Sequence, residues 1–91
     1  MSENAVVERA EVLAKVRAHL ASELELDEAD LSEQTRFRED LDADSLDLYE
    51  LIMELEDTYS IRVDEAAAAE IKTVANAVDF VTRALGSSSG G

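Results

Sequence analysis

The apolar residues of this chain recur twice with the same helical spacing. Each set occupies positions i, i+3, i+4, i+7 and i+11, which places its members along one side of an α-helix. This spacing predicts two amphipathic helices, over residues 44–59 and 74–85. The two sets are Leu48, Leu51, Ile52, Leu55 and Tyr59, and Val74, Ala77, Val78, Val81 and Leu85.

The rest of the chain is also predicted to be helical rather than extended. Apolar spacing predicts a first helix over residues 4–22, and residues 64–70 favour a short one. The expected apolar stripe of the first helix consists of Val6, Ala10, Leu13, Val16 and Leu20. There is no convincing strand alternation, and the 91 residues include no proline. We therefore expect an all-α fold, a small up-down bundle of three main helices plus one short helix, with a long first loop. Residues 1–3 are expected to be a flexible N-terminus, 4–85 one helical domain, and 86–91 a disordered Gly/Ser tail.

The segment between the first two predicted helices, residues 23–42, has no clean period. A loop this long in so small a domain is uncommon unless it is functional, disordered or tied down by inserted side chains. Its apolar residues favour the tied-down interpretation; they are Leu24, Leu26, Leu31, Phe37 and Leu41.

The charge balance restricts the partners of the chain. Acidic residues outnumber basic ones by 22 to 8, for a formal charge of −14. Phosphates repel such a chain, which argues against nucleic acid and anionic membranes and favours a basic protein partner. With no cysteine and one histidine, disulfides, Cys-ligated metals and His-rich metal sites are disfavoured. No apolar run approaches the ~20 residues of a membrane span. The first residues lack a secretory signal, so we expect a cytoplasmic protein.

Acidic residues are densest over residues 39–57, where nine of nineteen positions are acidic and none is basic. Asp40, Asp42 and Asp44 fit positions 1, 3 and 5 of an EF-hand calcium loop. However, position 6 is Ser45 instead of glycine, and position 12 is a leucine instead of the bidentate glutamate. We therefore assign no metal site, while looser divalent-cation binding by the three aspartates stays open.

Ser45 lies at the start of the helix predicted over residues 44–59. Either Ser45 or Asp44 could be its N-cap. A serine here is also well placed to carry a phosphodiester, because free N–H groups and the helix dipole favour an anion. Catalysis by Ser45 is not supported, since nothing brings the one imidazole, His19, near it and no Gly-x-Ser-x-Gly elbow exists. We find no catalytic constellation and expect no enzyme.

A second apolar set lies on a neighbouring face of the same predicted helix. It consists of Leu46, Tyr49 and Met53, at positions i, i+3 and i+7. A small bundle seldom buries two faces of one helix. The set is therefore either additional core or a docking surface.

Residues 40–51, with the sequence DLDADSLDLYEL, resemble the signature of acyl carrier proteins, and the likeness covers residues 36–85. In that family the serine carries 4′-phosphopantetheine through a phosphodiester. The resemblance thus implies a cofactor, delivered from coenzyme A, on Ser45, with Asp44 and Leu46 as flanking recognition residues. It further implies a carrier that holds acyl groups as thioesters in fatty-acid or polyketide synthesis. The short chain favours a free-standing carrier, and nothing in the sequence demands more than a monomer.

The implied partners are a phosphopantetheinyl transferase and basic-surfaced acyl-processing enzymes. The family's docking positions correspond here to Asp47, Tyr49, Glu50, Met53, Glu54, Glu56 and Asp57. The resemblance also implies that the bundle shelters the acyl chain. The candidate lining is Leu51, Ile52, Leu55, Ile71 and Val78, although these residues are equally suited to be ordinary core.

Two positions depart from the family pattern. Asp42 replaces the usual glycine before the motif, which predicts an altered turn, because aspartate adopts left-handed backbone less freely. Asp64 replaces the usual proline before the short helix, where it suits an N-cap. Other functions stay open: an aminoacyl or D-alanyl carrier, or an acidic helical protein that binds divalent metal or acts as an adaptor.

Overall fold

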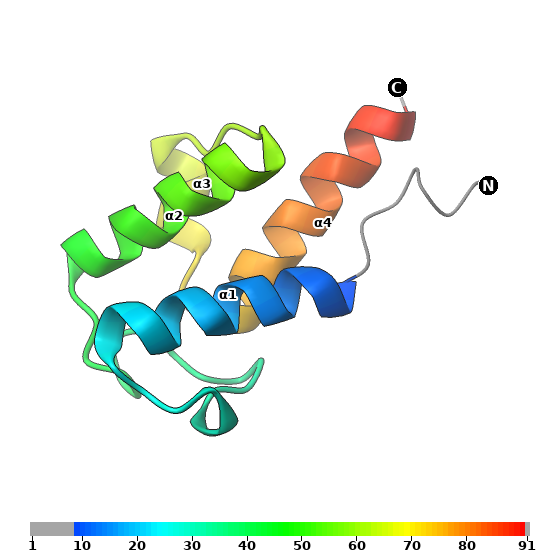
Figure 1. The fold of residues 1–91 in the computed structure, drawn as a ribbon. Coiled ribbons are helices and arrows are strands. Elements are labelled where there is room, and N and C mark those ends of the chain that lie inside the picture. The colour runs from blue at the N-terminus through cyan, green and yellow to red at the C-terminus, as the bar shows by residue number, and fades with distance from the viewer. Residues whose placement is uncertain (1–8, 91) are drawn as a thin grey trace.

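The computed structural model describes residues 9–90 and, for side chains, residues 9–85. The elements are helix α1 (Arg9–Leu24), the 3₁₀ helix η2 (Glu28–Asp30), and helices α2 (Ser45–Tyr59), α3 (Glu65–Glu70) and α4 (Val74–Gly90). Within residues 9–90 there is no strand, and one isolated antiparallel bridge joins Arg36 to Thr73. The predicted all-α class, with three main helices and a short one, is confirmed (Figure 1).

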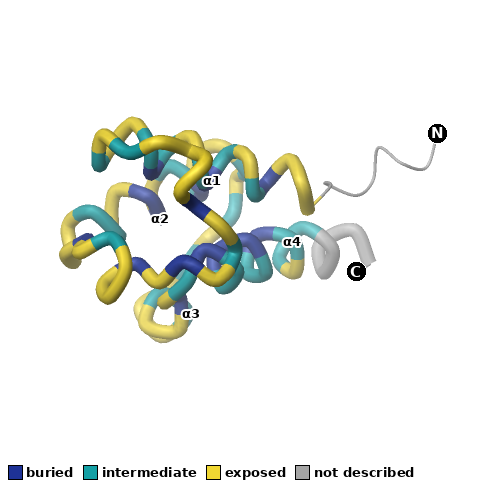
Figure 2. Tube along the Cα trace, turned by 90° about the horizontal axis from the view of Figure 1, so that it is seen from below, coloured by how far each residue is buried: buried dark blue, intermediate teal, exposed yellow. Residues whose placement is uncertain are grey.

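The core lies where α1, α2 and α4 meet. Helix α1 packs most extensively on α4, and α2 contacts both of them. Buried positions run along α4, whereas α3 has no buried residue (Figure 2). The helical part of the core consists of Val12, Val16, Leu20, Leu51, Leu55, Val74, Ala77, Val78 and Val81.

The long first loop is held in place by inserted side chains and backbone hydrogen bonds, as the sequence predicted. Leu31 and Phe37 are buried in the core, with the Phe37 side chain completely covered. The Phe37 N–H donates to the Lys72 carbonyl over 3.0 Å, and the Val74 N–H donates to the Thr35 carbonyl over 3.0 Å. The segment before α2 is thereby attached to the α3–α4 junction.

Helix α4 ends later than the sequence predicted. Helix α4 continues to Gly90, past the expected end at Leu85 and through most of the expected Gly/Ser tail. Each residue added to an existing helix gains a backbone hydrogen bond without a new nucleation cost, so a helix can outlast its apolar pattern. The expected start of the first helix at Asn4 and the expected flexible residues 1–3 lie outside the described residues.

The buried side of α1 also differs in detail from the expected stripe. Val12, Val16 and Leu20 are completely buried, whereas Ala10, a member of the expected stripe, is exposed. The three buried residues follow an i, i+4, i+8 row, the side of the helix that packs against the bundle. Among residues 9–90, no helix has both the length and the apolar character needed to cross a bilayer.

Candidate functional site at the start of helix α2

Helix α2 begins with a reciprocal capping box. The Asp44 side chain accepts a hydrogen bond from the Asp47 N–H over 3.0 Å, and the Asp47 carboxylate accepts one from the Asp44 N–H over 3.1 Å. The hydrogen bond from the Asp47 backbone lowers the pKa of Asp44, which therefore stays ionised at neutral pH. The sequence left the choice of cap open, and the structure selects Asp44. Ser45 is consequently the first helical residue, and its hydroxyl is not used as a cap.

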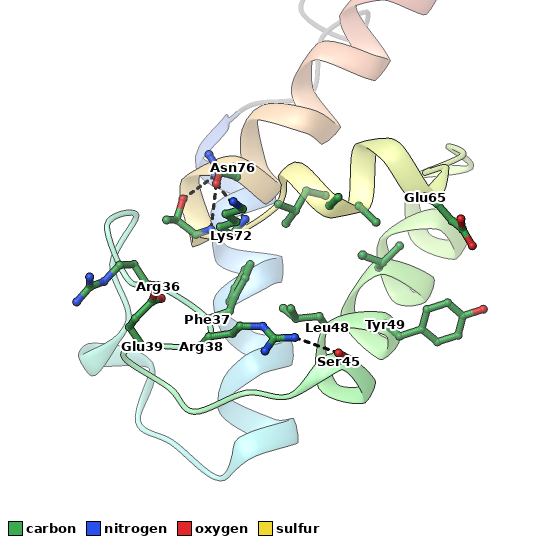
Figure 3. A pocket seen from close by; sticks show the side chains of 15 residues that line it. Arg36, Phe37, Arg38, Glu39, Ser45, Leu48, Tyr49, Glu65, Lys72 and Asn76 are labelled. Atoms are coloured by element: carbon green, nitrogen blue, oxygen red, sulfur yellow. Dashed lines mark hydrogen bonds between the residues drawn. The ribbon is translucent and has the colours of Figure 1, made fainter.

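The Ser45 side chain is exposed and has a cation beside it. Its hydroxyl oxygen accepts a hydrogen bond from Nη2 of Arg38 over 3.1 Å (Figure 3). Arg38 lies in the loop that precedes α2 and was not among the residues predicted from the sequence. The available signal was its position, because it is the last base before the acidic run of residues 39–57.

A cavity of about 770 Å³ opens beside Ser45. It lies between the loop at residues 36–39, the first turns of α2, and α3 with its junction to α4 (Figure 3). Of the five residues expected to form a lining, Ile52 and Ile71 do so. The other three, Leu51, Leu55 and Val78, are core residues that do not line it. The remaining apolar lining residues are Phe37, Leu48, Tyr49, Ala68 and Ala69.

The turn before α2 keeps a left-handed residue at the position of the family's glycine. Asp42 has a φ of 55°, and its N–H donates to the Arg38 carbonyl over 3.1 Å. The next N–H, that of Ala43, donates to the Phe37 carbonyl over 2.9 Å. Aspartate in place of glycine therefore does not remove the left-handed backbone conformation from this turn. Aspartate adopts the conformation that glycine would adopt more cheaply, since its Cβ crowds the backbone there.

The second apolar set of α2 is exposed. Leu46, Tyr49 and Met53 retain 62%, 60% and 51% of their accessible surface. The alternative that they form additional core is therefore wrong. We refer to these three residues as the recognition stripe.

The acidic residues expected to dock partners fall into two groups. Glu50 and Asp57 are exposed and Asp47 is half-buried. Glu54 is instead paired with Lys15 of α1, with 2.7 Å between carboxylate oxygen and Nζ, which lowers the pKa of Glu54. Glu56 accepts a hydrogen bond from the Val63 N–H over 2.8 Å. These last two carboxylates make contacts within the fold as well as contributing negative charge.

The three aspartates that could have bound a divalent cation have separate roles. Asp40 accepts hydrogen bonds from the Arg36 side chain, at 3.1 and 3.3 Å, which lower its pKa. Asp44 belongs to the capping box, and Asp42 occupies the left-handed turn. Among the residues that the structure describes, no group of three or more His, Cys, Asp or Glu side chains is arranged to hold a metal ion.

Comparison with known proteins relates the chain to one family. The family described as "Phosphopantetheine attachment site" matches residues 14–81. The acyl carrier protein of Rubrobacter xylanophilus is 45% identical over 75 residues, which cover 82% of this chain and 93% of the relative. The acyl carrier protein of Thermotoga maritima is 36% identical over 78 residues, 86% of this chain and 96% of the relative. A solved structure of the acyl carrier protein from Enterococcus faecalis has a TM-score of 0.75 at 31% identity, and the match covers 86% of this chain and 99% of that one. Together with the fold, these matches establish that the chain belongs to the acyl carrier protein family and that its cofactor is phosphopantetheine.

Proposed function

We propose that Ser45 is the residue to which 4′-phosphopantetheine is attached, and that the chain shuttles acyl groups between enzymes of fatty-acid or polyketide synthesis. The observation that carries this proposal is the exposed Ser45 hydroxyl, which projects beside Arg38 at the edge of the cavity. When bound, the cofactor supplies the thiol that this cysteine-free chain lacks, and acyl groups are attached to that thiol as thioesters.

The residues around Ser45 fit an attached phosphodiester. The capping box fixes the first turn of α2 and leaves the Ser45 hydroxyl outside it. A transferase can reach the hydroxyl because the residue is exposed. Arg38 supplies positive charge at a position where Asp44 and Asp47 supply negative charge. The carboxylates alone would repel a phosphate, so this cation makes the site compatible with one.

The surface of α2 suits brief encounters with partner enzymes. The recognition stripe offers three exposed apolar side chains, and Asp47, Glu50 and Asp57 flank it. A net charge of −14 accelerates association with basic surfaces, and salt weakens that attraction. A shuttle must also dissociate, and a small docking patch surrounded by charge gives modest affinity. We therefore propose that the phosphopantetheinyl transferase and the acyl-processing enzymes dock on this face.

The cavity supports acyl rather than aminoacyl cargo. Its wall includes Leu48, Ile52 and Ile71, against which an apolar chain loses contact with water. An aminoacyl group gains less from this apolar wall, and its charged amine would have to pair with one of the carboxylates that also line the cavity, Glu39 or Glu65. We propose that acyl chains fold back from the cofactor and enter between α2 and α3.

The test is conversion of the purified chain with coenzyme A and a broad-specificity phosphopantetheinyl transferase, followed by intact mass. The proposal predicts a gain of one phosphopantetheine for the wild type and none for Ser45→Ala. Ser32→Ala is the matched control, because Ser32 is an exposed serine in the loop that precedes α2 and its replacement should leave conversion unchanged. Conversion of Ser45→Ala, or no conversion of a folded wild type beside a working carrier, would overturn the assignment.

The class of cargo is tested on the converted protein. We expect thioesters of longer apolar chains to hydrolyse more slowly on this protein than on free pantetheine, because the cavity excludes water from them. The substitution Ala68→Asp, which places a charge on the cavity wall, should remove that protection. Equal hydrolysis rates on the protein and on free pantetheine would refute shelter by the cavity while leaving attachment at Ser45 intact.

A further inference from the structure

The acidic surroundings of Ser45 raise a question of charge compensation. Asp44 and Asp47 lie directly beside it in the capping box, and the chain as a whole carries −14. A phosphodiester on Ser45 adds another negative charge at this point. Close approach of like charges disfavours any fixed position for the phosphate unless a cation is aimed at it.

The Arg38 side chain points toward Ser45 and has further hydrogen-bond donors that are not used there. One N–H of its guanidinium binds the Ser45 hydroxyl oxygen over 3.1 Å. A guanidinium has five N–H donors in a planar fork, a shape that matches a phosphate. The neighbouring Arg36 is already committed, since its guanidinium binds Asp40. Among residues 9–85, Arg38 forms no ion pair.

The backbone under Arg38 is held in a defined position. Its carbonyl accepts the Asp42 N–H over 3.1 Å, and the adjacent Phe37 is completely buried. Phe37 is also hydrogen-bonded through its backbone to Lys72 and Ala43, at 3.0 and 2.9 Å. The guanidinium is therefore carried on a fixed backbone at the edge of the cavity, and Figure 3 shows it extended toward Ser45.

We propose that Arg38 binds the phosphodiester after Ser45 is modified, and thereby positions the first part of the arm over the mouth of the cavity. This inference rests on the proposed attachment at Ser45. Modification converts the hydroxyl oxygen into an ester oxygen, which is a poorer acceptor, and places two non-bridging oxygens that share one negative charge two bonds beyond it. The guanidinium exchanges a neutral acceptor for a charged one, which gives a shorter and stronger hydrogen bond.

The strength of this contact suits a carrier. Arg38 is exposed, so water and salt screen the pair, and such pairs shift an equilibrium by only about 1.5- to 5-fold. The arm is therefore biased toward the cavity between encounters and leaves readily when a partner enzyme draws it in. Because the pair is exposed, its effect should shrink as ionic strength rises. Arg38 acts as a positioning residue in this scheme and takes no part in bond making.

The test uses the modified protein and nuclear magnetic resonance. Conversion of the unmodified to the modified form should move the Arg38 Nε signal. Arg38→Gln should move the ³¹P signal of the phosphodiester and weaken the contacts between the arm and Ile52 by about 1.5- to 5-fold. Lys72→Gln is the matched control, because Lys72 is an exposed cation lining the same cavity. Arg38→Lys, which keeps the charge without the fork, should restore part of the effect.

The outcomes separate this inference from the proposed function. Intact mass first shows whether the wild type and each variant carry the cofactor. If the wild type carries it but the ³¹P signal and the arm contacts respond equally to Arg38→Gln and Lys72→Gln, Arg38 does not hold the phosphate and this inference alone fails. If the folded wild type does not accept the cofactor at Ser45, the proposed attachment fails and this inference fails with it.

Discussion

Replacing Asp42 with glycine should stabilise the fold. Asp42 has a φ of 55°, a left-handed conformation that costs an L-residue about 1–2 kcal/mol, with aspartate near the lower end. Glycine removes that cost but adds about 0.5–1 kcal/mol of chain entropy in the unfolded state. We therefore expect Asp42→Gly to raise the free energy of unfolding by about 0.5 kcal/mol. For a domain of this size, that corresponds to a rise in Tm of about 2–4 °C.

The same substitution also removes a negative charge, so its control must separate conformation from electrostatics. Asp42→Ala removes the same charge but keeps the Cβ that the left-handed backbone disfavours. The glycine variant should be more stable than the alanine variant by about 1 kcal/mol. Thermal unfolding followed by circular dichroism, at one pH and one salt concentration, measures the difference. Equal Tm values for the two variants would show that charge relief, not backbone conformation, explains any gain.

Three further predictions concern the loop, the cap and the docking face. Phe37→Ala should lower the free energy of unfolding by about 3–5 kcal/mol in urea titrations, because it empties a completely buried site in the segment before Ser45; a loss below 1 kcal/mol would contradict that role. Asp44→Ala should lower Tm at pH 7. Because folding depresses the pKa of Asp44 below its usual 3.8, the loss of Tm caused by Asp44→Ala should be complete above pH 3.8 and should vanish as the pH falls through the folded pKa. A loss of Tm that does not depend on pH in acid melting curves would refute the capping role. Tyr49→Ser should change stability by less than about 0.5 kcal/mol while raising the KM of the transferase, whereas an unchanged KM would argue against docking on the recognition stripe.

The helices were predictable because their apolar spacing is regular. The helix predicted over residues 44–59 matches α2 to within one residue at each end, and Leu51, Ile52 and Leu55 of its apolar stripe are buried. The exposed face was not decided by spacing, because Leu46, Tyr49 and Met53 could equally have been core. Only the packing of α2 on α1 and α4 shows which of its two apolar faces is covered.

The contacts around the site were less predictable, because they depend on how the long loop folds. The signature predicts Ser45 as the attachment residue, but whether Ser45 or Asp44 caps α2 depends on backbone geometry. Arg38 lies seven residues before Ser45, and no helical or strand periodicity connects them. The turn at Asp42 and the burial of Phe37 bring them together. Likewise, the expected end of α4 at Leu85 followed the last apolar residue, whereas the backbone continues to Gly90.

We propose that Ser45, and no other serine of the chain, carries the cofactor. Complete tryptic cleavage of the converted protein should release residues 39–62 as one peptide, since Arg38 and Arg62 bound a stretch without lysine or arginine. This peptide contains two serines, Ser45 and Ser60, and fragmentation in a mass spectrometer distinguishes them. We expect one phosphopantetheine on Ser45 and an unmodified Ser60. A phosphopantetheine on Ser60, or on a peptide outside residues 39–62, would contradict it.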